Sequence, residues 1–450
     1  MPHASLDRCA VAAITDGFAG PPRRHHQWYD QRALYAPIVK AHSDLVGATT
    51  GQIGQLVGLA LAPRQGPVHL ELTAGGKSRR RAIGCPRAIA AGAAAPLGRQ
   101  RPGAGRRLVA APAGRSSSAG SRPAMPPAPR PCAPLTRALG CPALVTYKAK
   151  GVIADHDDAC RHLPAVPPRS FGDCAKRPVD HGRPRSGRID PPTVAVRDRD
   201  DRTGLAPHPR HYLRPTVSCF GPLTDGLAAL SVATASDWST TAIARLRDQT
   251  RDALRYGKVA DGVSPEQVVT LAARQAAKLP QWPRATVDAG AHMFSATTFW
   301  PCAQPNDLLI SNGLATMGFA LPAGIAAALH EPSRPVIAFT GDGGLLMCAG
   351  ELATAVEQQV RLIVIVFNDG ALSLIDIKQQ QRQLPAAGVR WAPHDFAAMM
   401  KAFGGLGLRA RTAASYSAAL RRALQHDGPS LIDVQVDPSG YPEQLRALRG

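Results

Sequence analysis

The sequence is poor in aromatic residues, in regular cysteine spacings and in long apolar runs. Aromatic residues make up only 5% of its 450 residues. The nine cysteines form neither CxxC pairs nor a metal-ligand spacing, which argues against a zinc site and a disulfide framework and favours a reduced, cytoplasmic setting. No run of about 18 apolar residues occurs, and residues 1–20 lack a basic start followed by an apolar core, so we expect no membrane span and no secretion signal.

Acidic residues are unevenly spread along the chain. No Asp or Glu occurs between Leu72 and Ala154, although the whole chain has 33 acidic residues against 53 Lys and Arg. Residues 74–135 consist mainly of Ala, Arg, Pro, Gly and Ser, without aromatic residues or apolar periodicity. We predict that this basic, low-complexity segment is disordered, because it cannot bury enough apolar surface to fold. It has no interleaved aromatic residues and no recognisable nucleic-acid-binding motif, so we expect no specific nucleic-acid binding.

The C-terminal third, in contrast, is typical of an ordinary α/β domain. Ser264 followed by Pro265 predicts an N-cap and a helix through Lys278. Apolar runs of strand length then alternate with segments of helical spacing, which predicts a doubly wound parallel sheet. We expect strands at residues 286–290, 307–311, 336–340, 362–367, 406–410 and 430–436, and helices at 318–329, 346–359, 396–403 and 416–425.

Two of these apolar runs end in Gly and Asp. The first ends in Gly341-Asp342-Gly343 and the second in Asn368-Asp369-Gly370. Ligands of open α/β sheets bind at the carboxyl ends of the strands, so we expect Asp342 and Asp369 to face one another at that edge. Glycines let the backbone approach a phosphate, and carboxylate oxygens suit a hard cation such as Mg²⁺ that is shared with phosphates. The pair therefore predicts a metal-diphosphate site.

The order and spacing of these motifs resemble the cofactor signature of thiamine-diphosphate enzymes of the acetolactate synthase and benzoylformate decarboxylase group. The matching elements are Gly341-Asp-Gly343, a gap of 24 residues, Asn368-Asp369, and the flanking segments Ser311–Pro322 and Glu351–Ala355. The resemblance implies thiamine diphosphate and Mg²⁺ as cofactors, and residues 264–441 as the diphosphate-binding domain. It also implies a 2-oxo acid as the substrate, with decarboxylation, carboligation or both as the reaction.

The resemblance further implies a set of metal ligands and diphosphate contacts. Asp342 and Asp369 would bind Mg²⁺ through their side chains, with the backbone carbonyl of Ala371 as the third protein ligand. Many relatives have Asn at the position of Asp369. Gly341, Gly343 and Gly344 would lie against the diphosphate, and relatives often have Ser at the position of Gly344.

Three more residues are implied as cofactor-binding. Met317 would wedge beneath the cofactor and force its two rings together, which brings the amine next to the thiazolium carbon. The carbonyl of Ala315 would accept a hydrogen bond from that amine. His292 lies where a family loop touches the diphosphate, either as a proton shuttle near neutral pH or as a loop histidine that donates to a carbonyl.

Residues upstream resemble the other domains of the family only in part. Residues 22–73, with helical spacing at 51–61 and a strand at 66–72, are similar to the second half of a pyrimidine-binding domain, so the match to the family is N-terminally truncated. Residues 136–232 resemble a degenerate central domain, in which a strand precedes the turn at Lys150-Gly151. FAD, which some relatives use, is therefore doubtful. We expect partial α/β remnants here, and out-of-frame translation of a GC-rich gene stays open as the origin of the basic stretches.

Glutamate is the most consequential shortage. In the family, a glutamate from the first half of the pyrimidine-binding domain activates the cofactor, but here Glu71 is the only glutamate before Glu266. We expect Glu71 to be a surface carboxylate at a strand end, so the catalytic acid stays unidentified. Two alternatives remain: an active, homo-oligomeric enzyme, or a catalytically inactive remnant that binds the cofactor or pairs with an intact relative able to supply the glutamate.

Overall fold

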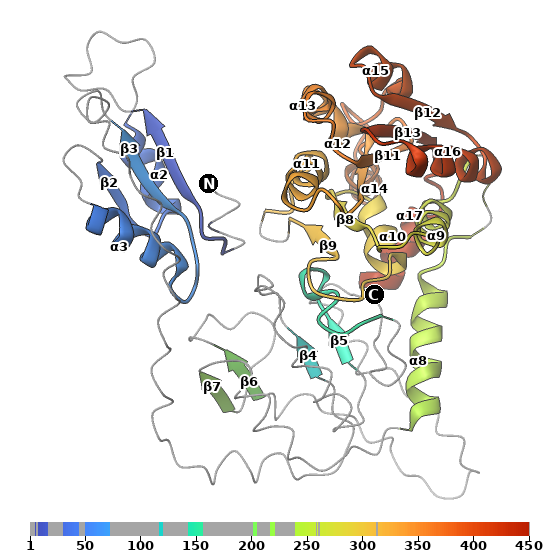
Figure 1. The fold of residues 1–450 in the computed structure, drawn as a ribbon. Helices are drawn as coiled ribbons and strands as arrows, with labels where there is room; N and C mark the ends of the chain where they lie inside the picture. The colour runs from blue at the N-terminus through green and yellow to red at the C-terminus, as the bar shows by residue number, and fades with distance from the viewer. Residues whose placement is uncertain are drawn as a thin grey trace, which may run out of the picture. The chain divides into compact units, whose positions relative to one another are not determined.

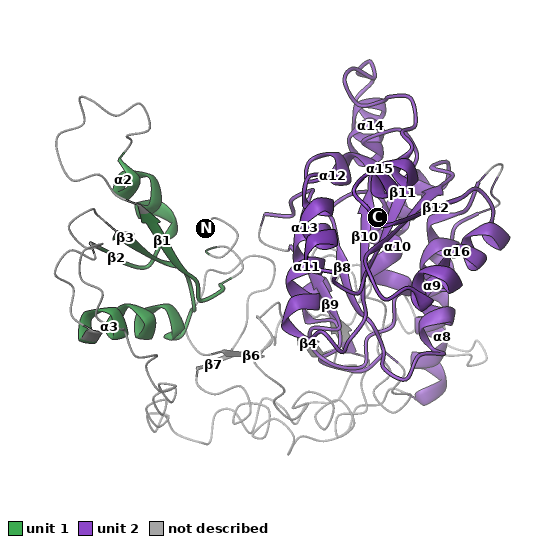
Figure 2. Ribbon diagram, turned by 45° about the horizontal axis from the view of Figure 1, so that its top comes forward, with its two compact units in different colours: residues 1–102, 201–211, 217–226 green, residues 103–200, 212–216, 227–450 purple. Residues whose placement is uncertain are grey.

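The computed structural model describes residues 5, 8–16, 30–44, 50–72, 117–119, 143–155, 201–204, 217–220, 239–257, 259, 262–311 and 314–449. They belong to two compact units (Figure 2): residues 1–102, 201–211 and 217–226 form unit 1, and the other residues form unit 2. No helix within these ranges is long and apolar enough to cross a membrane. Of the segment predicted to be disordered, only one short strand, Ser117–Ala119, falls among the described residues.

Unit 1 contains a three-stranded parallel sheet in the order β1-β3-β2. The predicted helix at 51–61 and the predicted strand at 66–72 are confirmed as α3 and β3. Strand β1 lies before the predicted range of 22–73 and pairs with the whole of β3. The elements are β1 (Ala12–Asp16), α2 (Gln31–Tyr35), η2 (Ala36–Ile38), β2 (His42–Asp44), α3 (Thr50–Leu61), β3 (Val68–Leu72), and a separate parallel pair of β6 (Asp201–Gly204) and β7 (Val217–Phe220).

Glu71 lies near a chain of polar contacts in unit 1. His69 is buried, with its Nδ1 2.8 Å from His42 Nδ1 and its Nε2 2.8 Å from the Thr15 hydroxyl. The same hydroxyl contacts the Gln31 side chain, so Thr15, Gln31 and the two histidines form one chain of polar contacts. The Glu71 carboxylate is half-buried and lies 3.9 Å from His42 Nε2. It is therefore a partly exposed carboxylate near the end of β3 beside a histidine, which agrees with the surface carboxylate at a strand end expected from the sequence.

Unit 2 is built on a six-stranded sheet in the order β12-β13-β11-β10-β8-β9, in which every neighbouring pair is parallel. Helices cover both faces (Figure 1), so the predicted doubly wound parallel sheet is confirmed. Every residue of β11 is buried, which explains its unbroken apolar run. The strands are β8 (Arg284–Val287), β9 (Leu308–Ile310), β10 (Val336–Gly341), β11 (Leu362–Asn368), β12 (Leu406–Ala410) and β13 (Ser430–Gln435).

The helices of unit 2 agree with the sequence where it carries a capping signal or an amphipathic pattern. Ser264 caps α9 in a capping box with Gln267, as predicted. The main core joins one face of the sheet to α11, α13 and α15. The helices are α8 (Thr240–Ala253), α9 (Pro265–Ala276), α10 (His292–Phe299), α11 (Ala320–His330), α12 (Asp342–Leu346), α13 (Glu351–Glu357), α14 (Ser373–Gln381), α15 (Phe396–Ala402), α16 (Ala413–Gln425) and α17 (Tyr441–Arg449).

Two predictions about helices are wrong. The helix expected at 346–359 is confined to α13, because α12 already ends at Leu346 and the backbone between the two helices makes turns in which an N–H bonds to the carbonyl three residues earlier. Gly350 lies in this break and has a low helix propensity. His292, expected in a loop, begins α10. Seven of the eight residues of α10 are buried, and the eighth, Met293, is half-buried. The helix therefore has no amphipathic pattern that its sequence could reveal.

Residues 143–155 belong to unit 2 and contact the chain that follows α10. The strand β5 (Ala143–Val145) pairs with β4 (Ser117–Ala119), and the 3₁₀-helix η4 (Tyr147–Ala149) leads into the predicted Lys150-Gly151 turn. The buried Lys150 ammonium pairs with Asp155 and donates to the Trp300 carbonyl at 2.6 Å. Gly151 has φ +87°, and a Cβ there would lie 2.0 Å from the Gln304 carbonyl oxygen. This turn therefore accepts only glycine.

Candidate functional site

The two Gly-Asp motifs meet at the carboxyl ends of adjacent central strands. Gly341 at the end of β10 is in register with Phe367 on β11, and the two aspartates follow directly. Asp342 is 2% exposed; its Oδ2 accepts from Gly370 N–H at 2.8 Å and its Oδ1 from Gly343 N–H at 2.7 Å. The side chain of one motif is therefore bonded to the backbone of the other. The predicted convergence of the two motifs is confirmed.

Asp369 lies beside Asp342 in a similar environment. Its Oδ2 accepts from the Ser373 hydroxyl at 2.6 Å and its Oδ1 from Ala371 N–H at 3.2 Å. Burial, and then the charge of Asp342, raise the pKa of Asp369 to about 7. Burial also raises the pKa of Asp342 to about 6, against the opposing effect of its backbone donors. Two carboxyls that resist ionisation together are a setting in which a divalent cation is strongly favoured.

All nine residues implied as cofactor or metal contacts line one pocket of about 170 Å³. No group of three or more His, Cys, Asp or Glu side chains suited to a metal occurs among the described residues. A cation held by the two aspartates would therefore need backbone or ligand oxygens to complete its coordination. The nine residues are His292, Ala315, Met317, Gly341, Asp342, Gly343, Gly344, Asp369 and Ala371.

His292 lies on the pocket wall and has one unpartnered ring nitrogen. Its ring stacks on Phe367 with centroids 5.1 Å apart, and its buried Nε2 has no hydrogen-bond partner within the part of the chain that the structure describes. Such an orphaned atom on the pocket wall fits a site that a polar ligand completes. Burial lowers the pKa of His292 to about 3, although a hydrogen bond to the Phe339 backbone opposes the shift. The ring is neutral at pH 7, so the proton shuttle considered for this histidine is disfavoured.

Asp288 supports the site, although the sequence predicts no function for it. It follows β8 and is fully buried, and its Oδ1 accepts from the N–H groups of Phe319 and Ala320, both at 2.6 Å. Its Oδ2 accepts from the Thr340 hydroxyl at 2.6 Å. These bonds tie the loop that carries Met317 to the end of β10. Asp288 falls inside the strand expected at 286–290, and a carboxylate in this otherwise apolar run is the only sequence signal that could have identified it.

The glycines after Asp342 are required by close packing. A Cβ on Gly343 would lie 2.5 Å from Leu372 Cδ2 and 3.1 Å from the Trp391 ring. A Cβ on Gly344 would lie 2.4 Å from Asp288 Oδ2, so the serine that relatives often have here does not fit beside Asp288 as it is placed in this chain. Ala315 has φ +51°, a conformation that is uncommon for alanine and typical of strained functional loops.

Replacing Asp369 with asparagine is expected to flatten the pH dependence of stability in metal-free protein. With both aspartates present, the native state binds more protons than the unfolded state between about pH 4 and 7, so the free energy of unfolding falls as pH rises through this window. At pH 8 we expect Asp369→Asn to raise that free energy by about 1–2 kcal/mol, after allowing for solvent screening. Urea unfolding with a chelator at pH 5 and pH 8 measures it, with the exposed Asp427→Asn as the control. If the free energy of unfolding changed equally between pH 5 and pH 8 in both variants, the raised pKa would not belong to Asp369.

Comparison with known proteins agrees with the site. Residues 288–434 match the family described as thiamine pyrophosphate enzyme, C-terminal TPP binding domain. The chain is 34% identical over 154 residues to acetolactate synthase of Bacillus subtilis, which covers 34% of this chain and 27% of the relative. It is 38% identical over 156 residues to acetolactate synthase isozyme 1 large subunit of Escherichia coli, covering 34% and 27%.

These matches span little more than a quarter of each curated relative and lie in one domain of this chain. Catabolic acetolactate synthase of Raoultella terrigena gives the same result, with 34% identity over 157 residues and 28% of its length covered. The fold, the matched range and the paired Gly-Asp motifs all coincide in unit 2. Residues 288–434 therefore carry the thiamine pyrophosphate enzyme C-terminal domain, and over this domain the chain is similar to acetolactate synthases.

Proposed function

We propose that the pocket of unit 2 binds the diphosphate of thiamine diphosphate through Mg²⁺. The observation that carries this proposal is the convergence of Asp342 and Asp369 from adjacent parallel strands into one pocket. The two carboxylates and the Ala371 carbonyl would hold the metal, and Gly341, the glycines that follow Asp342, and His292 would surround the diphosphate. Met317 and Ala315 would contact the thiamine portion.

The proposed substrate class is a 2-oxo acid, and the proposed reaction is decarboxylation, carboligation or both. When bound, thiamine diphosphate supplies an electron sink for making or breaking a carbon–carbon bond next to a carbonyl. The protein's part is to orient the cofactor: Asp288 fixes the loop that bears Met317, and the Asp342 side chain links the two metal-binding loops. The buried walls of the pocket, including Phe367 and Tyr441, exclude water from the reacting carbon.

A second candidate is a noncatalytic remnant that binds the cofactor or pairs with an intact relative. It is favoured by the scarcity of glutamate, since Glu71 is the only one before Glu266. Large apolar side chains are exposed at or near the pocket lining, namely Leu314, Leu346, Met347 and Ile375. They support a partner that covers this face, either a second copy of the chain or a relative. FAD has no part in the proposal, and the cysteine usage supports a cytoplasmic setting.

Calorimetry with thiamine diphosphate and Mg²⁺ tests the shared part of the two candidates. We expect saturable binding that requires both components, and failure to bind either one would overturn the proposal. Turnover of pyruvate or benzoylformate by the purified protein then separates them. Binding with turnover supports the enzyme, whereas binding without turnover supports the remnant.

A further inference from the structure

Residues 389–394, here called the back segment, return to the loop that follows β11. Leu372 N–H donates to the Val389 carbonyl at 2.8 Å, and Trp391 N–H donates to the Gly370 carbonyl at 2.8 Å. Ala371 and Arg390 form the antiparallel bridge between these two bonds. The back segment is therefore paired with the loop that contains Asp369 and Ala371.

Three further contacts fix the back segment. Arg390 makes a double ion pair with Asp376 on α14, with N···O distances of 3.2 and 2.8 Å. Asn368 donates to the His394 carbonyl at 2.9 Å. Gly370 has φ +71°, and a Cβ there would lie 2.7 Å from the Trp391 carbonyl oxygen, so the loop and the back segment touch without room for a side chain.

This pairing brings the Trp391 indole to the metal-binding loops. The ring lies against Gly343, with its Cη2 3.1 Å from the position of a Cβ on that residue. The buried indole N–H has no hydrogen-bond partner of normal geometry among the described residues. The Trp391 backbone N–H bonds to the Gly370 carbonyl and the Gly370 N–H bonds to the Asp342 carboxylate, so Trp391 and Asp342 are neighbours of the same residue, and both also adjoin Gly343. A buried donor without an acceptor costs about 1–3 kcal/mol, so a nearby carboxylate has a strong preference to accept from it.

We propose that Trp391 is a positioning residue of the Asp342–Asp369 site, whose indole N–H donates to the Asp342 carboxylate and orients it toward a divalent cation. The inference rests on the proposed function, since it assigns a role toward the Mg²⁺ of that site. Trp391 is not among the residues that line the pocket, so it acts through Asp342 and does not touch the ligand. Groups that hold a metal ligand from behind typically contribute about 10- to 100-fold to metal affinity.

Mg²⁺ titration in the presence of saturating thiamine diphosphate tests the proposal. We expect Trp391→Phe, which keeps an aromatic ring but removes the pyrrole part of the indole with its N–H, to weaken Mg²⁺ binding about 10-fold or more. The matched control is Trp282→Phe, because Trp282 also has a buried indole N–H without a partner in the described part of the chain but packs against Trp300 at a tilted angle and does not line the pocket. Wild-type affinity in Trp391→Phe would overturn the inference while leaving the proposed function intact. Absence of Mg²⁺ binding in the wild type would instead overturn both.

A second measurement does not depend on the variant folding. In ¹⁵N-labelled wild-type protein with thiamine diphosphate, the five tryptophans give five indole N–H signals. We expect one of them to shift when Mg²⁺ is added and to broaden when Mn²⁺ replaces it, because a paramagnetic ion broadens the nearest N–H most. If Mg²⁺ binds and no indole signal responds to either ion, Trp391 does not position the metal ligand.

Discussion

Replacing Asp342 with alanine is expected to remove measurable Mg²⁺ binding and, with it, metal-dependent binding of thiamine diphosphate. Asp342 is the better buried of the two carboxylates, and it also accepts from the Gly370 N–H of the opposite loop. The loss should exceed the roughly 10- to 100-fold that follows removal of a group behind a metal ligand, because here the ligand itself is lost. Calorimetric titration with Mg²⁺ at saturating thiamine diphosphate measures the change.

The control for this prediction must separate a lost ligand from a damaged fold. The pKa of Asp342 is raised to about 6 by burial, so its removal relieves an unfavourable ionisation at pH 8 in metal-free protein. We therefore expect the urea midpoint of the C-terminal domain to fall little while metal binding disappears. The exposed Asp427→Ala should bind like the wild type. Retained Mg²⁺ affinity in Asp342→Ala would contradict the proposed metal site.

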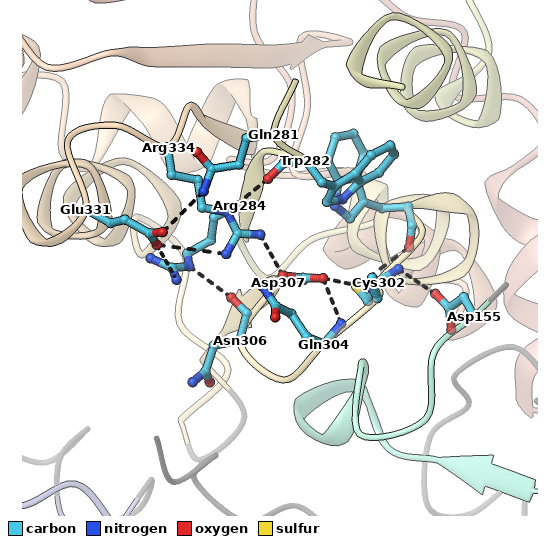
Figure 3. A network of polar contacts seen from close by, with 12 residues as sticks. Asp155, Gln281, Trp282, Arg284, Cys302, Gln304, Asn306, Asp307, Glu331 and Arg334 are labelled. Carbon is cyan, nitrogen blue, oxygen red and sulfur yellow. Dashed lines mark hydrogen bonds and ion pairs between the residues drawn. The ribbon is translucent and has the colours of Figure 1, made fainter. Parts of the chain in front are cut away.

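Replacing Asp307 with asparagine is expected to lower the free energy of unfolding of unit 2 by about 3–5 kcal/mol, since it leaves a buried guanidinium with only the partly exposed Glu331, at 3.9 Å, as a counter-charge. Arg334 and Asp307 are 4% and 1% exposed, and their N···O distance is 2.6 Å. Figure 3 shows Asp307 at the centre of a polar network, where its second oxygen accepts from Ala303 and Gln304 N–H groups at 2.8 and 2.9 Å. With its oxygen toward Arg334, an asparagine would point its amide N–H groups at the Ala303 and Gln304 N–H groups, which would then lose their acceptor.

Glu331→Gln is the matched control within the same network. Glu331 pairs with Arg284 at 3.0 Å, but its side chain is 35% exposed, so the same change from carboxylate to amide should cost only about 0–1 kcal/mol. Urea unfolding followed by circular dichroism compares the two variants. Similar losses would show that burial does not decide the strength of these ion pairs.

The parts of the fold that follow from local patterns are predictable from the sequence. Strands β10 and β11 are recognisable because they are buried on both faces and so read as unbroken apolar runs. Asp342 and Asp369 are predictable from the same runs, because strand ends of a parallel sheet share an edge. Helix α10 leaves no such signal, since it is buried nearly all round.

The residues that support the site depend on contacts between distant positions. Asp288 bonds to Ala320 and Thr340, which are 32 and 52 residues away. Trp391 reaches Gly370 through a chain reversal that no local motif encodes. Sequence patterns identify side chains that face a ligand when these lie at a strand end. They do not identify the supporting residues that bond to those side chains, because these contacts exist only once the chain has folded.

The segment at 143–155 has a consequence for the order in which the chain folds during synthesis. Lys150 leaves the ribosome 150 residues before Trp300, whose carbonyl accepts a hydrogen bond from the Lys150 ammonium. Cys302, whose N–H donates to Asp155, follows Trp300. Until then its ammonium stays hydrated, because burial without the complete set of partners is too costly. The segment must therefore wait in an open form and dock only after the first part of the C-terminal sheet has emerged, which makes its docking a late and non-local step of folding.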